Sequence, residues 1–427
     1  MKPTDPRLNR RAFLGGTAAL GALAAFPTII PARAFGANER IRTGHIGVKN
    51  QGTSNLKALK KNVVAVCDVD KDVLAKAKEL AENNGAHDVA TYSDYRALLD
   101  NKDIDAVVIT TPDHWHALMT NDACAAGKDV YCEKPLSLTI AEGRAMVESA
   151  RKHKRIVQTG SQQRSDDRFR LACELVRSGR LGKIKTITVG LPGVNFAGPA
   201  VPDTTPPPEL DYDFWLGPAP ARAYNPKHVH YNFRFFWDYS GGQMTNFGAH
   251  HLDIAQWALG RDDSGPVAIE GTATFNKDGW YEVPESSRVV FTYDDGIKII
   301  CEQGMKGGVP GGVTFHGERG SMHVDRGKIK SDPADLTKEA LTKDDVHLYV
   351  SKNHHANWLE CIKSRELPIC DVEIGHRSST VCHLGNIAAR IGRPLKWDPS
   401  KEQFLDDTEA ASMLSRPYRN PWKLRVS

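Results

Sequence analysis

The main body of the 427-residue sequence lacks an excess of charge of either sign. Lys and Arg number 56 and Asp and Glu number 52, but the first 37 residues hold five of the basic residues and one of the acidic residues. The rest of the chain is therefore formally neutral. A neutral body gives no electrostatic reason to expect binding to nucleic acid or to an anionic membrane surface.

Metal-site spacings and internal repeats are also absent. The eight cysteines form no CxxC pair and mostly lie within apolar stretches, so we expect buried thiols, although oxidation of a pair stays open for an exported protein. The histidine pairs have no cysteine or carboxylate at a recognised spacing: His228 with His230, His250 with His251, and His354 with His355. We therefore predict no metal centre.

A pair of arginines precedes a mildly apolar run near the N-terminus. Arg10 and Arg11 are followed by residues 13–30, which are rich in Gly and Ala. This pattern predicts a twin-arginine signal peptide over residues 1–37 rather than a membrane anchor, because its small residues make transfer into hydrocarbon weak. We expect the twin-arginine translocase as a partner, a periplasmic location, and folding around any cofactor before export.

Short apolar runs alternate with amphipathic helical segments between residues 38 and 160. The apolar runs are His45–Val48, Val63–Cys67, Ala106–Thr110, Asp129–Cys132 and Arg155–Thr159. The helical segments are Asn55–Lys61, Val73–Asn83, His116–Ala126 and Ile140–His153. Alternation of this length predicts an α/β fold with a doubly wound parallel sheet.

The pattern changes near residue 161, where we place a second domain that extends to residue 427. Strands are predicted over Ile184–Leu191, Val267–Phe275, Ser287–Tyr293 and Lys298–Glu302, and helices over Asp167–Ser178, Ala356–Lys363 and Ser378–Ile391. Because most of these strands have no helix between them, we expect a mostly antiparallel sheet. The loop-rich stretch Pro192–Tyr231 is typical of a functional loop or a cover over a site.

A glycine turn follows the first predicted strand. Gly47, Lys49, Gln51 and Gly52 have the outline of a dinucleotide-binding turn, in which glycines allow a tight turn, close approach of the pyrophosphate and helix packing. Lys49 replaces the middle glycine; its Cβ can crowd the phosphates, whereas its ammonium can reach them.

Asp68 ends the second strand, where a carboxylate accepts hydrogen bonds from ribose hydroxyls and repels a 2′-phosphate. We therefore expect NAD rather than NADP, with capping of the next helix as the alternative role of Asp68.

Further motifs follow the next strands. Thr110-Thr111-Pro112 with His116, then Glu133-Lys134-Pro135, and finally the segment from Gly241 to Asp253 carry a specific pattern. With these motifs the sequence resembles the Gfo/Idh/MocA family of oxidoreductases over nearly all of the chain after Ile46. The resemblance implies an N-terminal Rossmann domain, a C-terminal α/β domain with a large open sheet, and a nicotinamide cofactor between them.

The resemblance also implies roles for particular residues. Thr111, Pro112, His116, Glu133 and Lys134 are assigned to the cofactor site, although for His116 we favour a structural role as the anchor of the turn after the fourth strand. Relatives commonly associate through the sheet of the second domain, so we expect a homo-oligomer.

The segment after Gly241 supplies the remaining candidate chemistry. If it forms a helix, Asn246, His250, Asp253 and Trp257 share one face. By resemblance His250 is the base that takes the hydroxyl proton, and Lys134 stabilises the developing alkoxide. Asn246 stands where the family usually has an aspartate, so it can orient His250 by a hydrogen bond but cannot neutralise an imidazolium.

Other positions are weaker candidates. Gln162 and Arg164 follow the last strand of the first domain and can meet cofactor or substrate, but a domain-joining turn explains them equally well. We also assign four side chains near the Gly241 segment to substrate binding; the three that precede Gly241 can form a wall against which a sugar stacks, with a place in the core as the alternative. They are Arg234, Trp237, Tyr239 and His251.

Export constrains the reaction, because free NAD is not expected outside the cytoplasm and the cofactor should stay bound through turnover. Either one sugar reduces the cofactor and another reoxidises it, or a glycoside is oxidised, cleaved by elimination and reduced again. We expect an NAD-dependent oxidoreductase acting on a hydroxyl of a sugar, polyol or glycoside, with an NAD-dependent glycosidase or lyase as the alternative. A sugar-binding protein without activity is a third hypothesis, motivated by Lys49 and Asn246.

Overall fold

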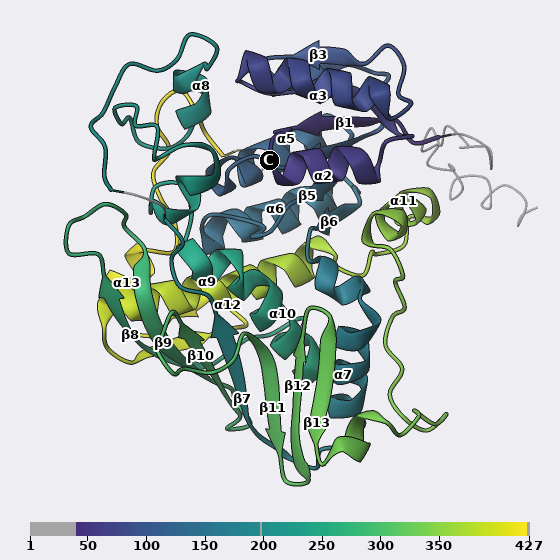
Figure 1. Cartoon of the computed structure of the whole chain (residues 1–427), viewed down its shortest axis with the longest axis vertical. Helices are drawn as coiled ribbons and strands as arrows, with labels where there is room; N and C mark the ends of the chain where they lie inside the picture. Colours follow the sequence, from purple (N-terminus) through teal and green to yellow (C-terminus); the bar gives the residue numbers. More distant parts are fainter. Residues whose placement is uncertain (1–39, 197–198, 425–427) are drawn as a thin grey trace, which may run out of the picture. The chain divides into compact units, whose positions relative to one another are not determined.

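The computed structural model describes residues 40–196 and 199–424, so the predicted signal peptide lies outside the described residues. In this described part, no helix is both long enough and apolar enough to cross a membrane. The chain from residue 41 builds one sheet of six strands and one of nine, and helices pack against both sheets (Figure 1).

The six-stranded sheet is parallel throughout and has the strand order β3-β2-β1-β4-β5-β6. Its strands are β1 (Thr43–Ile46), β2 (Val63–Cys67), β3 (Ala90–Tyr92), β4 (Ala106–Ile109), β5 (Asp129–Cys132) and β6 (Val157–Thr159). The helices between them are α2 (Gln51–Ala58), α3 (Lys71–Asn83), α4 (Tyr95–Asp100), α5 (His116–Ala125) and α6 (Ile140–Lys152). The order reverses between β1 and β4, and such a switch point is where doubly wound sheets bind ligands. The predicted parallel sheet is confirmed.

In the six-stranded sheet, the strands that were predicted from the sequence are the ones that are buried in the structure. β2 and β5 have the predicted bounds to the residue, because both are runs of apolar residues enclosed by the fold. β3 and α4 were not located in the sequence. β3 has three residues and none of them is fully buried, so it carries little apolar signal.

The nine-stranded sheet has the order β13-β12-β11-β7-β10-β9-β8-β14-β15, and all its neighbours are antiparallel except β7 and β10. Its strands are β7 (Ile184–Leu191), β8 (Ala268–Phe275), β9 (Pro284–Thr292), β10 (Lys298–Gln303), β11 (Gly312–Gly317), β12 (Gly320–Asp325), β13 (Lys328–Asp332), β14 (Leu395–Asp398) and β15 (Gln403–Phe404). The mostly antiparallel sheet is confirmed. The hairpins β11 to β13 were not predicted, because Gly, Lys and Asp interrupt their short apolar pattern.

Helices from separate parts of the chain pack on the nine-stranded sheet. They are α7 (Asp167–Arg177), α10 (Gly248–Leu259), α12 (Val372–Ile391) and the short α13 (Thr408–Ser412), while α9 (Gly242–Asn246) packs on α10 and α12 (Figure 1). Their apolar side chains form one large core with the strands. α12 begins six residues before the predicted start because the Asp371 carboxylate accepts a hydrogen bond from the Glu373 N–H and caps the helix.

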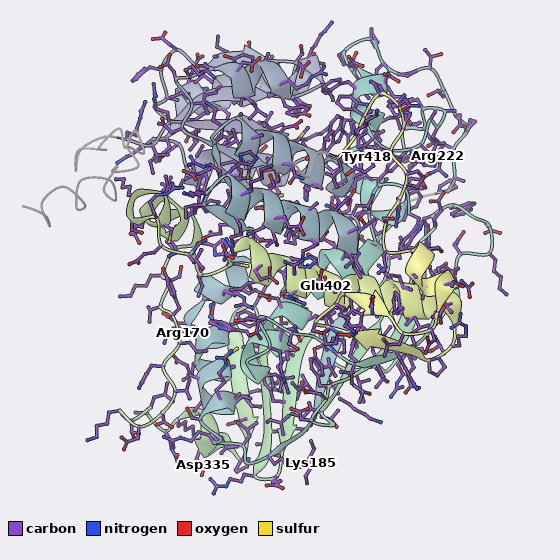
Figure 2. All side chains as sticks on the ribbon, turned by 180° about the vertical axis from the view of Figure 1, so that it is seen from behind. Arg170, Lys185, Arg222, Asp335, Glu402 and Tyr418 are labelled. Atoms are coloured by element: carbon purple, nitrogen blue, oxygen red, sulfur yellow. The ribbon has the colours of Figure 1, made fainter. Side chains whose placement is uncertain are left out.

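The last part of the chain also returns to the six-stranded sheet. α11 (His354–Ser364) buries Trp358 against it. Tyr418, labelled in Figure 2, donates its hydroxyl to Glu142 of α6 at 2.6 Å. The two halves of the described chain are therefore joined by contacts from segments far apart in sequence.

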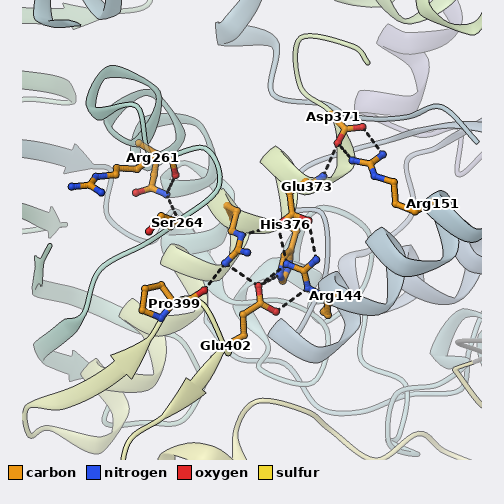
Figure 3. Close-up of polar contacts among 11 residues, drawn as sticks. Arg144, Arg151, Arg261, Ser264, Asp371, Glu373, His376, Pro399 and Glu402 are labelled. Atoms are coloured by element: carbon orange, nitrogen blue, oxygen red, sulfur yellow. Dashed lines mark hydrogen bonds and ion pairs between the residues drawn. The ribbon is translucent and has the colours of Figure 1, made fainter. Parts of the chain in front are cut away.

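Ion pairs add to this junction between α6 and α12, as Figure 3 shows. Arg144 of α6 binds Glu373 at 2.8 Å and Glu402 at 2.7 Å, and His376 Nε2 lies 2.6 Å from the same Glu402 carboxylate. Arg151 pairs with Asp371 at the start of α12. Because these groups are mostly half-buried or buried, they are screened less than surface pairs.

Candidate functional site

The turn between β1 and α2 is built closely enough to require both of its glycines. Gly47 has φ of +77°, and a Cβ there would lie 2.8 Å from the carbonyl oxygen of Thr110. A Cβ on Gly52 would overlap the carbonyl oxygen of Gly47. Lys49, in contrast, is exposed, so its side chain does not fill the turn. Backbone can therefore approach a phosphate here, in spite of the lysine.

Asp68 follows β2 and faces the same turn. Its carboxylate accepts hydrogen bonds from Val48 N at 3.0 Å and from Asp70 N at 3.1 Å. Burial raises the pKa of Asp68 to about 6, against the lowering effect of these two bonds. The capping role considered for Asp68 is wrong, because Asp70 caps α3 by accepting from Asp72 N and Val73 N.

A cavity of about 390 Å³ opens between this turn and the loop-rich segment after β7; we call it the turn cavity. On one side it is lined by Gly47, Lys49, Gln51, Asp68, Thr111, Pro112, Asp113, His116, Glu133 and Lys134. On the other side it is lined by Leu210, Phe214, Trp215, His230, Tyr231, Phe233 and Arg234. The predicted cofactor residues thus converge on one space, except that Gly52 supports the turn from behind and Gln162 lies further along. The Thr111 hydroxyl there is buried and has no partner, so it is free for a ligand.

The loop-rich segment is fastened over the turn cavity. Lys71 N donates to Glu209 O at 3.0 Å, and Asp211 N donates to Val69 O at 3.0 Å. The indole N–H of Trp115 donates to Trp215 O at 3.0 Å. The segment therefore forms a cover over this cavity, which is one of its two predicted roles.

Glu133 is held at the centre of the site by amide groups. Its Oε1 accepts from Asn55 Nδ2 at 3.2 Å, Gln162 Nε2 at 3.1 Å and Gln51 Nε2 at 3.4 Å. Burial nevertheless raises the pKa of this carboxyl. His355 reaches Asn55 Oδ1 with Nε2 at 3.1 Å. Sequence reasoning missed Asn55 and His355, because neither belongs to a motif and only the packing of α11 brings them together.

His116 anchors the turn after β4. Its Nδ1 lies 2.8 Å from the carbonyl oxygen of Pro135, and its Nε2 lies 2.9 Å from that of Thr111. Because carbonyl oxygens only accept, both ring nitrogens must donate and the ring is an imidazolium. Burial by itself lowers the pKa of His116, but the Cys132 sulfur, Asp113 and the Pro135 carbonyl raise it overall.

Lys134 lines the turn cavity and also a second cavity, which is described in the next paragraph. Its Nζ donates to Asn246 Oδ1 at 2.8 Å and to Asn246 O at 3.1 Å. Burial lowers the pKa of Lys134 to about 8, and the nearby charges of Arg234 and Arg326 act in the same direction. The Lys134–Pro135 peptide bond is cis. The two hydrogen bonds fix the ammonium in place. Its pKa of about 8 means that it loses its proton only slightly above neutral pH.

A second cavity of about 430 Å³ lies on the other side of Lys134; we call it the histidine cavity. It is lined by Gln51, Glu133, Lys134, Gln162, Gln163, Asp166, Phe169, Asn246, Phe247, His250 and Arg326. His250 is buried, its Nδ1 has no partner, and burial, followed by the charges of Lys134 and Arg326, keeps its pKa well below the usual value. The imidazole is therefore neutral and can accept a proton.

Two expectations about Asn246 are wrong. The predicted single helix is broken at Phe247, where His250 N donates to the carbonyl three residues back, so Asn246 and His250 belong to α9 and α10 respectively. Asn246 does not hydrogen bond with His250; it accepts from Lys134, and its Nδ2 donates to Gln243 Oε1 at 3.0 Å. Asn246 therefore positions the ammonium instead of the imidazole.

The predicted substrate residues separate in space. Arg234 lines the turn cavity, with its guanidinium carbon 3.9 Å from the Tyr231 ring centroid. Arg164, Trp237, Tyr239 and His251 line neither cavity. Their roles in binding stay predictions that the structure gives no reason to prefer over a place in the core.

The four remaining side chains have structural partners or are buried. The Arg164 guanidinium binds Asp253 at 2.7 Å, with both side chains buried, and also binds Asp262. Trp237 lies between two guanidiniums, that of Arg390 at 3.7 Å and that of Arg416 at 4.1 Å from its ring centroid. Tyr239 and His251 are buried.

Thiols and metal ligands complete the survey of reactive groups. All eight cysteines are buried and free. Within residues 40–196 and 199–424, no group of three or more His, Cys, Asp or Glu side chains is arranged to hold a metal ion.

Two family models match the chain in consecutive parts. One, described as the oxidoreductase family's NAD-binding Rossmann fold, covers residues 36–161, and the other, its C-terminal α/β domain, covers residues 174–424. The chain belongs to the Gfo/Idh/MocA family. It is therefore a nicotinamide-dependent oxidoreductase of the kind that acts on CH–OH groups, as its motifs predict.

Individual relatives are distant. The chain is 24% identical to a myo-inositol 2-dehydrogenase of Thermotoga maritima over 83% of this chain and 95% of the relative. It is 36% identical to a glycosyl hydrolase family 109 protein of a Shewanella species, over 26% of each chain. A crystal structure of an aldose-aldose oxidoreductase from Caulobacter crescentus shares the fold, with a TM-score of 0.63 and 19% identity over 84% of this chain and 99% of the other.

Proposed function

We propose that this protein oxidises a hydroxyl group of a sugar, a polyol or a glycoside, with NAD in the turn cavity and the substrate in the histidine cavity. The main observation in support is Lys134, which lines both cavities and whose Nζ is fixed on Asn246. A group at this position can contact the reacting oxygen from the wall between cofactor and substrate. The names of the relatives, a polyol dehydrogenase and an aldose oxidoreductase, support this substrate class.

The residues present fit a dinucleotide. Gly47 and Gly52 keep the turn free of Cβ atoms, Asp68 offers a partly buried carboxylate beside the end of β2, and the Thr111 hydroxyl is unpartnered. The bound nicotinamide supplies a hydride acceptor. We infer NAD rather than NADP, because the Asp68 carboxylate repels a 2′-phosphate.

Two side chains divide the proton chemistry. The neutral imidazole of His250 takes the proton of the substrate hydroxyl as its carbon loses hydride. Lys134 Nζ, with two of its N–H groups on Asn246, directs its third toward the substrate oxygen and stabilises the negative charge that develops there. Glu133 and His116 hold the backbone on either side of this lysine.

The location and the overall cycle are parts of the same proposal. The Arg10-Arg11 motif supports export by the twin-arginine pathway to the periplasm, where the cofactor must stay bound. A two-sugar cycle then regenerates it. A glycosidase or lyase cycle is the alternative, supported by the name of the family 109 relative.

We also propose a homo-oligomer formed through the face of the nine-stranded sheet opposite α7, α10 and α12.

The experiment that tests the proposal starts from protein purified without added cofactor. Acid release should yield close to one NAD(H) per chain, and sugars, polyols and glycosides should change the absorbance at 340 nm. Cleavage of a glycoside without net reduction would instead assign the glycosidase cycle. A protein that neither carries nor binds NAD would contradict the proposal and favour simple sugar binding.

A further inference from the structure

The histidine cavity contains a cation that sequence analysis did not single out. Arg326 stands in the turn between β12 and β13 and lines the cavity together with Lys134, Asn246 and His250. Among the residues that the structure describes, no carboxylate lies within ion-pair distance of its guanidinium. Arg326 is exposed to solvent on one side and lines the cavity on the other, so its guanidinium can bind a negatively charged group of a ligand there.

The Arg326 side chain is directed by its neighbours. Its guanidinium carbon lies 5.5 Å from the centroid of the Phe247 ring. The Gln163 amide, oriented so that both of its groups are satisfied, accepts from Arg326 Nε at 3.3 Å and donates to His250 O at 3.0 Å. Arg326 is therefore connected to the backbone of His250, while its two terminal NH₂ groups have no protein acceptor.

The acidic groups of this cavity are already engaged. Glu133 accepts from several amides, as described above. Asp166 binds the guanidinium of Arg168 at 2.7 Å and caps α7. Two of the three N–H groups of Lys134 donate to Asn246, and the proposed function assigns the third to the reacting oxygen. Arg326 is thus the cation of this cavity whose two terminal NH₂ groups can both turn to a ligand.

We propose that the substrate of the histidine cavity is an acidic carbohydrate, and that Arg326 binds its carboxylate. This inference rests on the proposed function and narrows its substrate class. A guanidinium presents two parallel N–H donors that match the two oxygens of a carboxylate, and a charged hydrogen bond discriminates more strongly than one to a neutral hydroxyl. The cavity volume of about 430 Å³ suits a monosaccharide-sized ligand.

The test compares methyl hexuronides of several configurations with the methyl hexosides that differ only at C6. NAD-loaded protein is titrated with each probe by calorimetry, and its turnover is followed at 340 nm. We expect at least about a tenfold preference for the uronides, and Arg326→Gln should weaken uronide binding by about 10- to 100-fold while leaving hexosides within about threefold. Arg319→Gln, on the exposed turn between β11 and β12 at the opposite end of β12, is the matched control and should change neither.

Two further variations sharpen the assignment. Arg326→Lys keeps the charge but not the paired donors, so it should recover only part of the uronide preference. Raising the salt concentration from 50 mM to 500 mM should reduce the preference, because Arg326 is exposed to solvent on one side and salt screens its charge.

Several outcomes overturn the inference. If Arg326→Gln weakens the binding of uronides and of hexosides equally, the residue has a structural role. If the protein prefers hexosides, or binds none of the probes, the substrate is not an acidic carbohydrate. Tighter binding of hexose 6-phosphates than of uronides would assign the site to a phosphate ester. If uronides bind through Arg326 but no probe is oxidised, the proposed function fails and the binding assignment stands. If hexosides are oxidised as well as uronides, the proposed function stands and the inference fails.

Discussion

The two cavities that meet at Lys134 are built in different ways. The turn cavity is formed on one side by the glycine turn and by other loops that follow strands of the parallel sheet, and these loops bring the carboxylates of Asp68, Asp113 and Glu133 to it. The histidine cavity takes side chains from the loops after β5 and β6, from α9 and α10, and from the β12–β13 hairpin. A site made by one regular sheet is suited to a constant cofactor, whereas a site made by separate segments can change its substrate by changing one of them.

The largest expected effect falls on the residue that both cavities share. Lys134→Ala should lower kcat by about 10³-fold, because it removes the cation beside the reacting oxygen, while NAD stays bound through the turn. Single-turnover reduction of bound NAD measures the chemical step, and acid release measures the cofactor. Lys102→Ala, on the exposed surface of the same half of the chain, serves as the control. Loss of cofactor from Lys134→Ala would show that the two cavities do not work separately.

Gly52→Ala should damage the turn cavity alone. The added Cβ overlaps the Gly47 carbonyl oxygen, so the turn must shift, at a cost of about 1–3 kcal/mol that appears as roughly 10- to 100-fold weaker NAD binding. NADH fluorescence titration gives the affinity, and a denaturation curve separates this from global unfolding. Gly311→Ala has open space around its Cβ and should leave both unchanged. Unaltered NAD affinity in Gly52→Ala would mean that the turn does not contact the pyrophosphate.

Asp68→Asn tests the cofactor choice with a smaller expected effect. NAD affinity should fall about tenfold, because a charged acceptor for the ribose hydroxyls becomes a neutral one, and NADP affinity should rise. Competitive titration of the two dinucleotides measures both changes. The exposed Asp72→Asn at the start of α3 is the matched control. If the ratio of the two affinities stays constant, Asp68 has a purely structural role in the β1–α2 turn.

The smallest expected change is a shift in pH dependence. With its pKa near 8, Lys134 is protonated at neutral pH and loses its charge above pH 8, so kcat/KM for oxidation should fall on the alkaline side of that value. Asn246→Asp places a carboxylate beside Nζ, which should raise the lysine pKa and move this limb upward by about one unit. Asn83→Asp, on the exposed end of α3, should not move it. An activity that rises through pH 8 would make Lys134 the base and leave His250 with a positioning role.

Sequence reasoning located the backbone of the site better than its side-chain contacts. Gly47 and Asp68 were identified because each follows an apolar strand at a spacing that a parallel sheet imposes, whereas Lys134 was identified through the motif that resembles the family. Asn246 was identified, but its partner was not, because the helix break at Phe247 depends on how α9 and α10 pack. Arg326 was missed since its hairpin has a weak strand pattern and lies far from the other site residues in the chain.

The sequence by itself determined the parallel sheet, the mostly antiparallel sheet that follows it, the family, and the cofactor turn, because buried strands and their glycine turns leave a local pattern of apolar and small residues. The tertiary structure decided that Lys134 is held by Asn246, that Glu133 is clamped by Asn55, Gln51 and Gln162, and that Arg326 lines the histidine cavity. The reason is physical: these contacts join residues tens to hundreds of positions apart, and their free energy depends on the burial and geometry that only the packed chain creates.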